Sequence, residues 1–132
     1  MILVDTNILV AYWNNKDSCH ERAIKVLKKI EQGVYGPSFI TDYIFDEAVT
    51  VTSIKSGRKT AAELGNALLQ SFHVAKITEP IFHEAWKIFR ETQKLSFTDC
   101  TNAAAAEELD AAFIATFDAD YKKLKEISIV DY

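Results

Sequence analysis

The chain has 132 residues, of which 48% are apolar and 26% are charged, and its formal net charge is −4. These values exclude a disordered or fibrous protein and argue against nucleic-acid binding through a broad basic surface. They still allow a nuclease, because divalent ions held by carboxylates would supply positive charge locally. No apolar run is long enough to cross a membrane, and the opening residues lack the pattern of a signal peptide. Cys19 and Cys100 lie far apart without ligand-like spacing, so we expect packed thiols in a cytoplasmic protein.

The first half of the chain alternates predicted strands and helices. Residues 2–5 form an aliphatic run that ends in an acid, which predicts a buried strand, and a helix follows to Trp13. Ser18 and Glu21 have the spacing of a capping box and predict a second helix that ends near Gly33. A strand is expected at 38–41.

The pattern continues through the middle of the chain. Thr41 or Asp42 should cap a helix that runs to about Gly57. Thr60 and Glu63 are again spaced as a capping box, and they predict the next helix. Residues 73–77 then form a third predicted strand.

A proline-containing start at 79–80 predicts a further helix. Its apolar residues recur at helical spacing, and we expect all of them in the core: Ile81, Phe82, Ala85, Trp86 and Phe89. A helix is predicted at 98–109, a strand at 111–117, one helical turn at 121–124 and a last strand at 127–130. The whole pattern, residues 1–132, predicts a single three-layer α/β domain with a central, mostly parallel sheet and helices on both faces.

Two acids occupy positions that an ordinary surface acid would not. Asp5 ends the first strand, where open α/β sheets collect functional groups, although an Asp there would also suit a helix N-cap. Glu47 lies among Ile44, Val51 and Ile54 at the helical period, so it projects from the apolar stripe of its helix. A carboxylate that faces the core is costly unless something pairs with it or coordinates it. The alternative is an acid at the margin of the stripe that reaches water.

Two further acids have weaker individual signals. Asp99 lies three residues after Ser96, so a capping box alone would explain it. Asp118 follows an apolar strand as Asp5 does, and Asp120 competes with it for any role. If the four acids meet at one sheet edge, their repulsion calls for a cation, and oxygen ligands favour Mg²⁺ or Mn²⁺. Hydrolysis of a phosphodiester bond is the natural chemistry of such a site.

These segments together resemble the PIN domain family. The resemblance rests on Asp5-Thr6-Asn7 after the first strand, the inward Glu47, Phe97-Thr98-Asp99 at a helix start, and Thr116-Phe117-Asp118-Ala119-Asp120-Tyr121 after a later strand. The family usually has Phe where this chain has Tyr121. The length and one-domain layout look most like the VapC-type toxins of bacterial and archaeal toxin–antitoxin pairs.

The resemblance implies a metal-dependent ribonuclease with RNA as its substrate, commonly a homodimer and commonly held inactive by a small antitoxin. By position, Asp5, Glu47, Asp99 and Asp118 match the acidic quartet of the family and would hold Mg²⁺ or Mn²⁺. Asp5 and Asp99 would be the firmest ligands, whereas Glu47 and Asp118 would complete the shell or orient water. Neighbouring hydroxyls and amides would hold the carboxylates in place; these are Thr6, Asn7, Thr98 and Thr116.

Two other readings stay open at this level. An aspartate-nucleophile phosphatase would need an acid two residues after Asp5, where this chain has Asn7. A non-catalytic PIN-like binding module would keep the acids only as structure. Two basic groups could guide an RNA backbone or simply be solvated: Lys55, Arg58 and Lys59, and Lys122, Lys123 and Lys125.

Overall fold

The computed structural model describes residues 1–124 and 126–132 and is built around a five-stranded parallel sheet. The strand order is β3-β2-β1-β4-β5, and each neighbouring pair is parallel. The strands are β1 (Ile2–Val4), β2 (Ser38–Thr41), β3 (His73–Ala75), β4 (Phe113–Ala115) and β5 (Ser128–Val130). The predicted α/β fold is therefore confirmed, and the sheet is parallel at every pairing.

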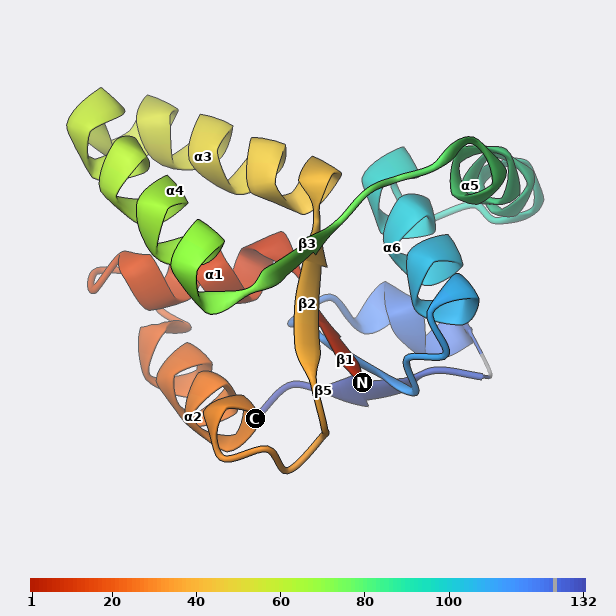
Figure 1. Cartoon of the computed structure of the whole chain (residues 1–132), viewed down its shortest axis with the longest axis horizontal. Helices are drawn as coiled ribbons and strands as arrows, with labels where there is room; N and C mark the ends of the chain where they lie inside the picture. The colour runs from red at the N-terminus through yellow and green to blue at the C-terminus, as the bar shows by residue number, and fades with distance from the viewer. Residues whose placement is uncertain (125) are drawn as a thin grey trace.

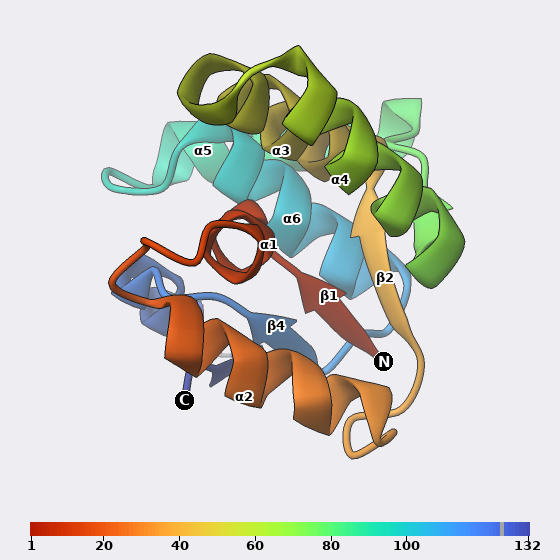
Figure 2. The same cartoon turned by 90° about the vertical axis from the view of Figure 1, so that its left-hand side faces the viewer.

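Helices cover both faces of this sheet, as right-handed crossovers require. Figure 1 shows four helices to one side: α1 (Thr6–Trp13), α2 (His20–Glu31), α3 (Asp42–Ser56) and α4 (Arg58–Ser71). On the other side lie α5 (Glu79–Glu91), α6 (Phe97–Glu108) and the short 3-10 helix η1 (Ala119–Lys123). Figure 2 shows α1 and α2 in front of β1 and β4, with α6 behind them.

The central strand, β1, is buried on both faces and borders the point where the strand order reverses. Ile2, Leu3 and Val4 of β1 are fully buried, because β2 and β4 flank the strand and helices cover both its faces. The connections run one way from β1 to β2 and the other way from β4 to β5, so the strand order reverses between β1 and β4. At such a switch point the carboxyl ends of the two strands border a crevice, which is where open α/β sheets bind ligands.

The alanine run of α6 explains how this helix approaches the sheet so closely. Residues 103–106 are all alanine and all buried. Small side chains let the helix backbone lie near the sheet, which brings the first turn of α6 beside the end of β1. The sequence of α6 therefore fixes the place of Asp99 relative to Asp5.

Two predicted capping boxes are wrong and one is correct. The α2 helix begins at His20 after Cys19, and Asp17 Oδ1, not Ser18, accepts a bond from the Cys19 N–H at 2.8 Å. The α4 helix begins at Arg58, directly after Gly57, whose φ of 91° makes a sharp turn from α3 and leaves Thr60 inside the helix. The box at the start of α6 is present, with both of its hydrogen bonds.

The expectation that the whole apolar stripe of α5 is core is wrong for its three aromatic residues. Ile81 and Ala85 are buried, but Phe82, Trp86 and Phe89 are 40%, 48% and 38% exposed. The reason is that α5 packs on α6 rather than on the sheet (Figure 1), and α6 covers only part of the apolar arc. A row of aromatic rings is left at the surface.

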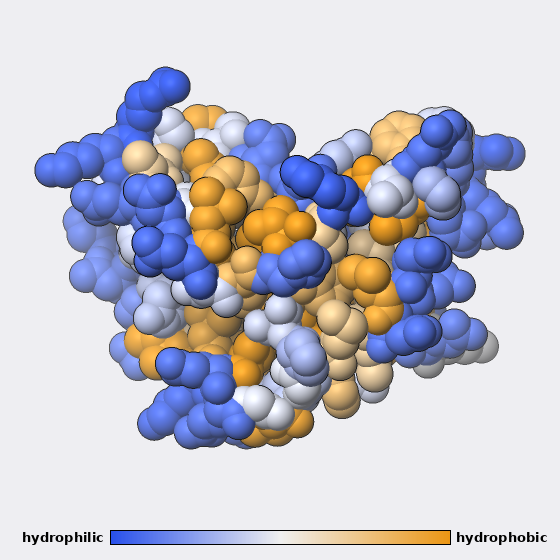
Figure 3. All heavy atoms as spheres, viewed as in Figure 1, coloured by the Kyte–Doolittle hydropathy of each residue, from blue (hydrophilic) through white to orange (hydrophobic). Residues whose placement is uncertain are grey.

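None of the helices in the described residues has both the length and the hydrophobicity needed to cross a membrane. The overall surface is hollowed between the part formed by α3 and α4 and the part formed by α5 (Figure 3).

Candidate functional site

Asp5 stands at the centre of the site, at the carboxyl end of β1. It is both the N-cap of α1 and a buried acid, with 3% of its surface exposed. Its Oδ1 accepts hydrogen bonds from the Thr6 N–H at 2.8 Å and from Asn102 Nδ2 at 3.2 Å. Its Oδ2 accepts from Thr116 Oγ1 at 2.8 Å and from Asn7 Nδ2 at 3.4 Å. The helix-cap and site interpretations of Asp5 are thus compatible.

The electrostatics of Asp5 reflect burial beside other acids. The pKa of the Asp5 carboxyl is raised to about 6, chiefly by loss of water and also by the nearby Asp99 and Glu47 carboxylates. Hydrogen bonds from Thr116 and Thr6 act in the opposite direction but do not outweigh burial. A cation bound beside Asp5 would stabilise the ionised form of this carboxyl and lower its pKa.

Asp99 also serves two purposes at once. Its Oδ2 accepts a hydrogen bond from the Ser96 N–H at 3.0 Å, and its own N–H donates to Ser96 Oγ at 3.1 Å, which completes the capping box. Its Oδ1 accepts a hydrogen bond from the Tyr121 hydroxyl at 2.9 Å. The capping box therefore holds Asp99 at the helix start, and Tyr121 aims its other oxygen.

Three of the four predicted acids line one cavity of about 280 Å³, namely Asp5, Glu47 and Asp99. Glu47 is half-buried and reaches the cavity from the middle of α3. Of the apolar stripe predicted around it, Ile44 is buried, but Ile54 in the last turn of α3 is 80% exposed, so that part of the prediction is wrong. The remaining lining residues are Thr6, Asn7, Val10, Asp17, Val51 and Lys55. Four elements of the chain thus converge at the switch point of the sheet.

Asp118 and Asp120 do not line this cavity. The Asp118 carboxylate caps η1 by accepting a bond from the Asp120 N–H at 2.9 Å. The Asp118 N–H donates to Thr116 Oγ1 at 3.1 Å, and that hydroxyl donates in turn to Asp5. Asp118 is therefore linked to the site through Thr116, whereas its carboxylate points to the start of η1.

Sequence reasoning missed several members of the site. Asp17 lines the cavity from the loop after α1, and no motif marks it. Lys55 lines it as well, whereas the sequence indicates only that Lys55 belongs to a basic cluster. Asn102 and Tyr121 are both fully buried and both contact the acids. An amide just before an alanine run was the available signal for Asn102, because a buried polar group needs a partner.

The donor set suits a hard divalent cation. Every candidate ligand in the cavity is an oxygen, but among the described residues no group of three or more His, Cys, Asp or Glu side chains is placed to hold a metal ion together. Mg²⁺ does not need a full cage of protein ligands, because it usually keeps several waters and binds through one or two carboxylates. The buried Thr6 Oγ1 and Asn102 Oδ1, which have no hydrogen-bond partner among the described residues, add to the polar surroundings.

The histidines and cysteines play no part in the cavity. His20 Nδ1 lies 2.8 Å from the Ala11 carbonyl oxygen, and His83 lies 3.5 Å from Glu79 on the surface of α5. Cys19 and Cys100 are free thiols, as expected, and Cys100 is buried. Of the second basic group, Lys122 Nζ lies 3.9 Å from an Asp131 oxygen, and Lys125 lies outside the described residues.

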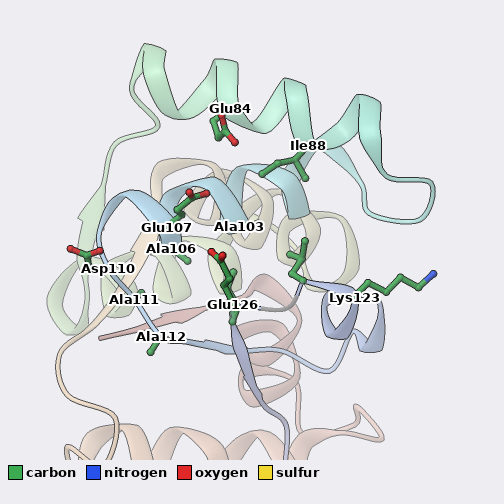
Figure 4. A pocket seen from close by; sticks show the side chains of 12 residues that line it. Glu84, Ile88, Ala103, Ala106, Glu107, Asp110, Ala111, Ala112, Lys123 and Glu126 are labelled. Atoms are coloured by element: carbon green, nitrogen blue, oxygen red, sulfur yellow. The ribbon is translucent and has the colours of Figure 1, made fainter.

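A larger cavity of about 540 Å³ lies at the opposite edge of the sheet, near the starts of β4 and β5. Four acidic residues line it, Glu84, Glu107, Asp110 and Glu126, together with several alanines, and Figure 4 shows Lys123 extending away from them. These acids come from α5, α6, the turn after α6 and the segment before β5, and none of the predicted site residues lines the cavity. The smaller cavity is the one in which three of the predicted site acids come together.

Known proteins with similar sequences and structures agree with this arrangement. The PIN domain family model matches residues 2–127. A VapC ribonuclease from Archaeoglobus fulgidus is 25% identical over 118 residues, which cover 86% of this chain and 74% of that protein. Among solved structures, VapC20 of Mycobacterium tuberculosis, described as a toxin that cleaves the sarcin–ricin loop, has a TM-score of 0.82 at 20% identity. That match covers 96% of this chain and 97% of VapC20.

Two further solved structures are similar in fold. A toxin–antitoxin complex from Klebsiella pneumoniae gives a TM-score of 0.72 at 18% identity, covering 97% of this chain and 96% of that chain. VapBC2 from Rickettsia felis, bound to a DNA fragment of its promoter, gives 0.73 at 14% identity, covering 100% and 99%. The match along nearly the whole sequence, together with the acids at the switch point, shows that this chain belongs to the PIN domain family.

Proposed function

We propose that this chain is a metal-dependent endoribonuclease that acts in the cytoplasm as the toxin of a type II toxin–antitoxin pair. The observation that carries the proposal is the convergence of Asp5, Glu47 and Asp99 on one cavity at the switch point of the sheet. Membership of the PIN family and similarity to a protein named as a VapC ribonuclease support the same activity.

Asp5 and Asp99 would hold the Mg²⁺ or Mn²⁺ ion, and Glu47 would complete the shell or orient the attacking water. When bound, the ion supplies positive charge that activates water and stabilises the charge on the phosphate. Thr116, Asn7 and Asn102 orient the Asp5 carboxylate through their hydrogen bonds. We assign Asp118, the fourth acid of the quartet, an indirect part: it caps η1, the helix that carries Tyr121.

RNA would approach from the open side of the cavity, where Lys55 is exposed on the last turn of α3. Lys55 can contact a phosphate without carrying sequence information. Arg58 and Lys59 follow it at the exposed start of α4. The target RNA would therefore be positioned beside the acids by a small basic cluster, despite the net negative charge of the chain.

The first prediction separates this enzyme from a non-catalytic binding module. The wild-type chain should cleave structured RNAs in Mg²⁺ or Mn²⁺ and lose cleavage in EDTA. Asp99→Asn should reduce the rate by roughly 100-fold or more, because it removes a charged metal ligand. Asp46→Asn is the matched control, since Asp46 is an exposed acid beside Glu47 and does not line the cavity.

If wild type and Asp99→Asn cleave equally in either metal, a contaminating nuclease explains the activity. If neither cleaves any RNA of a broad pool, the binding-module interpretation gains. Release of inorganic phosphate from a phosphomonoester would instead favour the phosphatase reading.

The second prediction concerns the cost of burying Asp5. Because the folded pKa of about 6 lies above the ordinary value of 3.8, folding favours the protonated acid, and this contribution to stability is lost as the pH rises through 6. In EDTA, the stability of Asp5→Asn relative to wild type should therefore be higher at pH 8 than at pH 5 by about 1 kcal/mol, whatever the constant cost of replacing one acceptor oxygen by an NH2 group. Urea unfolding at the two pH values measures this difference.

Added Mg²⁺ should stabilise the wild type and have little effect on Asp5→Asn, because only the former keeps the full ligand set. A stability difference that does not change with pH would contradict the assigned cause of the pKa shift.

The proposed protein partner is a small antitoxin, as in the toxin–antitoxin complex from Klebsiella pneumoniae that has a similar fold. An apolar groove of about 420 Å³ between α1, α2 and α4 suits an amphipathic segment of such a partner; its large apolar members include Leu9, Tyr12, Trp13, Leu27, Leu64, Leu68 and Phe72. Co-expression with a candidate antitoxin that binds the chain should suppress cleavage of RNA. Tyr12→Asp, at the exposed rim of the groove, should restore it, whereas Ile54→Asp on α3 should not. Suppression that survives Tyr12→Asp would place the partner elsewhere.

We further propose that the chain forms a homodimer through the exposed aromatic face of α5, which consists of Phe82, Trp86 and Phe89. The Trp86 and Phe89 rings stack with centroids 5.7 Å apart, and single exposed patches of this kind mark interaction sites. The charges of the helix are self-complementary, since Glu79 lies in its first turn and Arg90 in its last. A two-fold axis near Trp86 would place Phe82 beside Phe89, and Glu79 beside Arg90, of the second copy.

Light scattering coupled to gel filtration tests this interface. The wild type should elute as a dimer at micromolar concentration, and Trp86→Ala should shift it to the monomer, because central aromatic residues contribute most of the binding energy. Leu69→Ala, at an exposed apolar residue of α4, should leave the dimer intact. A monomeric wild type, or a dimeric Trp86→Ala variant, would exclude the aromatic face of α5 as the dimer interface.

A further inference from the structure

A chain of three hydrogen bonds connects the two principal acids through neutral side chains. Asn102 Nδ2 donates to Asp5 Oδ1 at 3.2 Å and to the Tyr121 hydroxyl at 2.9 Å. The Tyr121 hydroxyl then donates to Asp99 Oδ1 at 2.9 Å. Asn102 and Tyr121 are both completely buried, so no surface water competes for these bonds.

The chemistry of the end groups fixes the direction of every bond. Ionised carboxylates only accept hydrogen bonds, so the Asn102 nitrogen must face Asp5, and the Tyr121 proton must point at Asp99. A phenol is a neutral donor at neutral pH, so the arrangement is well ordered when both acids are charged.

Packing alone does not account for either residue. A phenylalanine at position 121 would fill the same space without a buried hydroxyl. The Asn102 Oδ1 atom is buried and has no hydrogen-bond partner among the described residues, which is a cost that a leucine would avoid. Both residues fill space in the core, and in addition each has a hydrogen-bond donor. Asn102 donates to Asp5, and Tyr121 donates to Asp99.

The bonds leave Asp99 free to bind an ion, whereas each oxygen of Asp5 already accepts two hydrogen bonds, of which the 3.4 Å bond from Asn7 is the longest and the first that an ion would displace. Asp99 uses one lone pair of Oδ2 for the Ser96 N–H and one of Oδ1 for Tyr121, so each oxygen keeps a second lone pair. Asp5 and Asp99 repel each other, and this repulsion would spread them apart in the absence of an ion. Hydrogen bonds from a shared neutral link oppose that movement.

We propose that Tyr121 and Asn102 form a neutral brace that holds the Asp5 and Asp99 carboxylates at the spacing a divalent cation needs. Both are positioning residues, since they act on the ion only through the two acids. This inference rests on the proposed function, because it takes Asp5 and Asp99 as the ligands.

Direct measurement of metal binding without RNA tests the brace. Mn²⁺ titrated into the full chain, with free ion followed by its electron paramagnetic resonance signal, gives the affinity independently of catalysis. Tyr121→Phe should weaken Mn²⁺ binding about tenfold, as the loss of a hydrogen-bond partner of a metal ligand typically does. Tyr35→Phe is the matched control, because it removes a hydroxyl that is hydrogen-bonded to Tyr132, near the start of β2, at the opposite sheet edge.

A double-mutant cycle with Asn102→Leu distinguishes a brace from two separate structural roles. If the pair acts as a unit, Tyr121→Phe with Asn102→Leu should bind Mn²⁺ about as weakly as the weaker single variant, whereas independent roles would multiply the losses. Stability should behave differently, because the double variant buries no orphaned donor and should lose less stability than the two single variants combined. The double variant also serves if either single variant fails to fold.

The outcomes separate the brace from the proposed function. A wild type that binds no Mn²⁺ overturns the metal site itself. A wild type that binds Mn²⁺ and cleaves RNA, with Tyr121→Phe of unchanged affinity or with multiplying losses in the cycle, overturns the brace and leaves the nuclease in place.

Discussion

The burial of one carboxylate at the end of the central strand is the constraint on which the rest of the site depends. Asp5 is held where β1 stops, and four hydrogen bonds converge on its two oxygens. An ionised acid in such a place is tolerated only when several donors and an ion compensate for the lost water. The surrounding residues can be understood as that compensation: two amides, a hydroxyl and a backbone N–H from three different segments.

The same constraint explains why α6 is built as it is. Asp99 must come close to Asp5, and the fully buried run of alanines allows the helix to lie against the sheet. The capping box then fixes the first turn of α6, so a feature that stabilises the helix also sets the direction of a functional carboxylate. Helix capping and a place in a functional site are usually weighed as rival explanations of an acid, yet Asp99 both caps α6 and lines the acidic cavity. The same holds for Asp5 at the start of α1.

The fold could be predicted from the sequence because alternating apolar runs and helical stripes report directly on burial. Asp5 and Glu47 stand out in the sequence because a strand-end acid and an acid on an apolar stripe each carry a physical cost, whereas Asp99 is explained locally by its capping box and stands out only together with the other acids. Asn102 and Tyr121 could not be predicted, because their role depends on contacts between residues 97 and 22 positions apart in the chain. Asp118 shows that a similar position in the sequence does not ensure a similar place in the structure. It follows a strand as Asp5 does, but its carboxylate accepts a hydrogen bond at the start of η1.

The aromatic residues of α5 show why apolar periodicity alone does not establish burial. Periodicity tells which residues share a face, but the width of the covering surface decides how many of them are buried. Because α5 rests on another helix and not on the broader sheet, Ile81 and Ala85 are covered and the three rings beside them are not. Phe97, two residues before the site acid Asp99 in the first turn of α6, packs edge-on against Phe82, Trp86 and Phe89. The exposed aromatic face of α5 is therefore continuous with the residue that begins the helix of Asp99, so burial of that face and the placement of the first turn of α6 depend on the same ring.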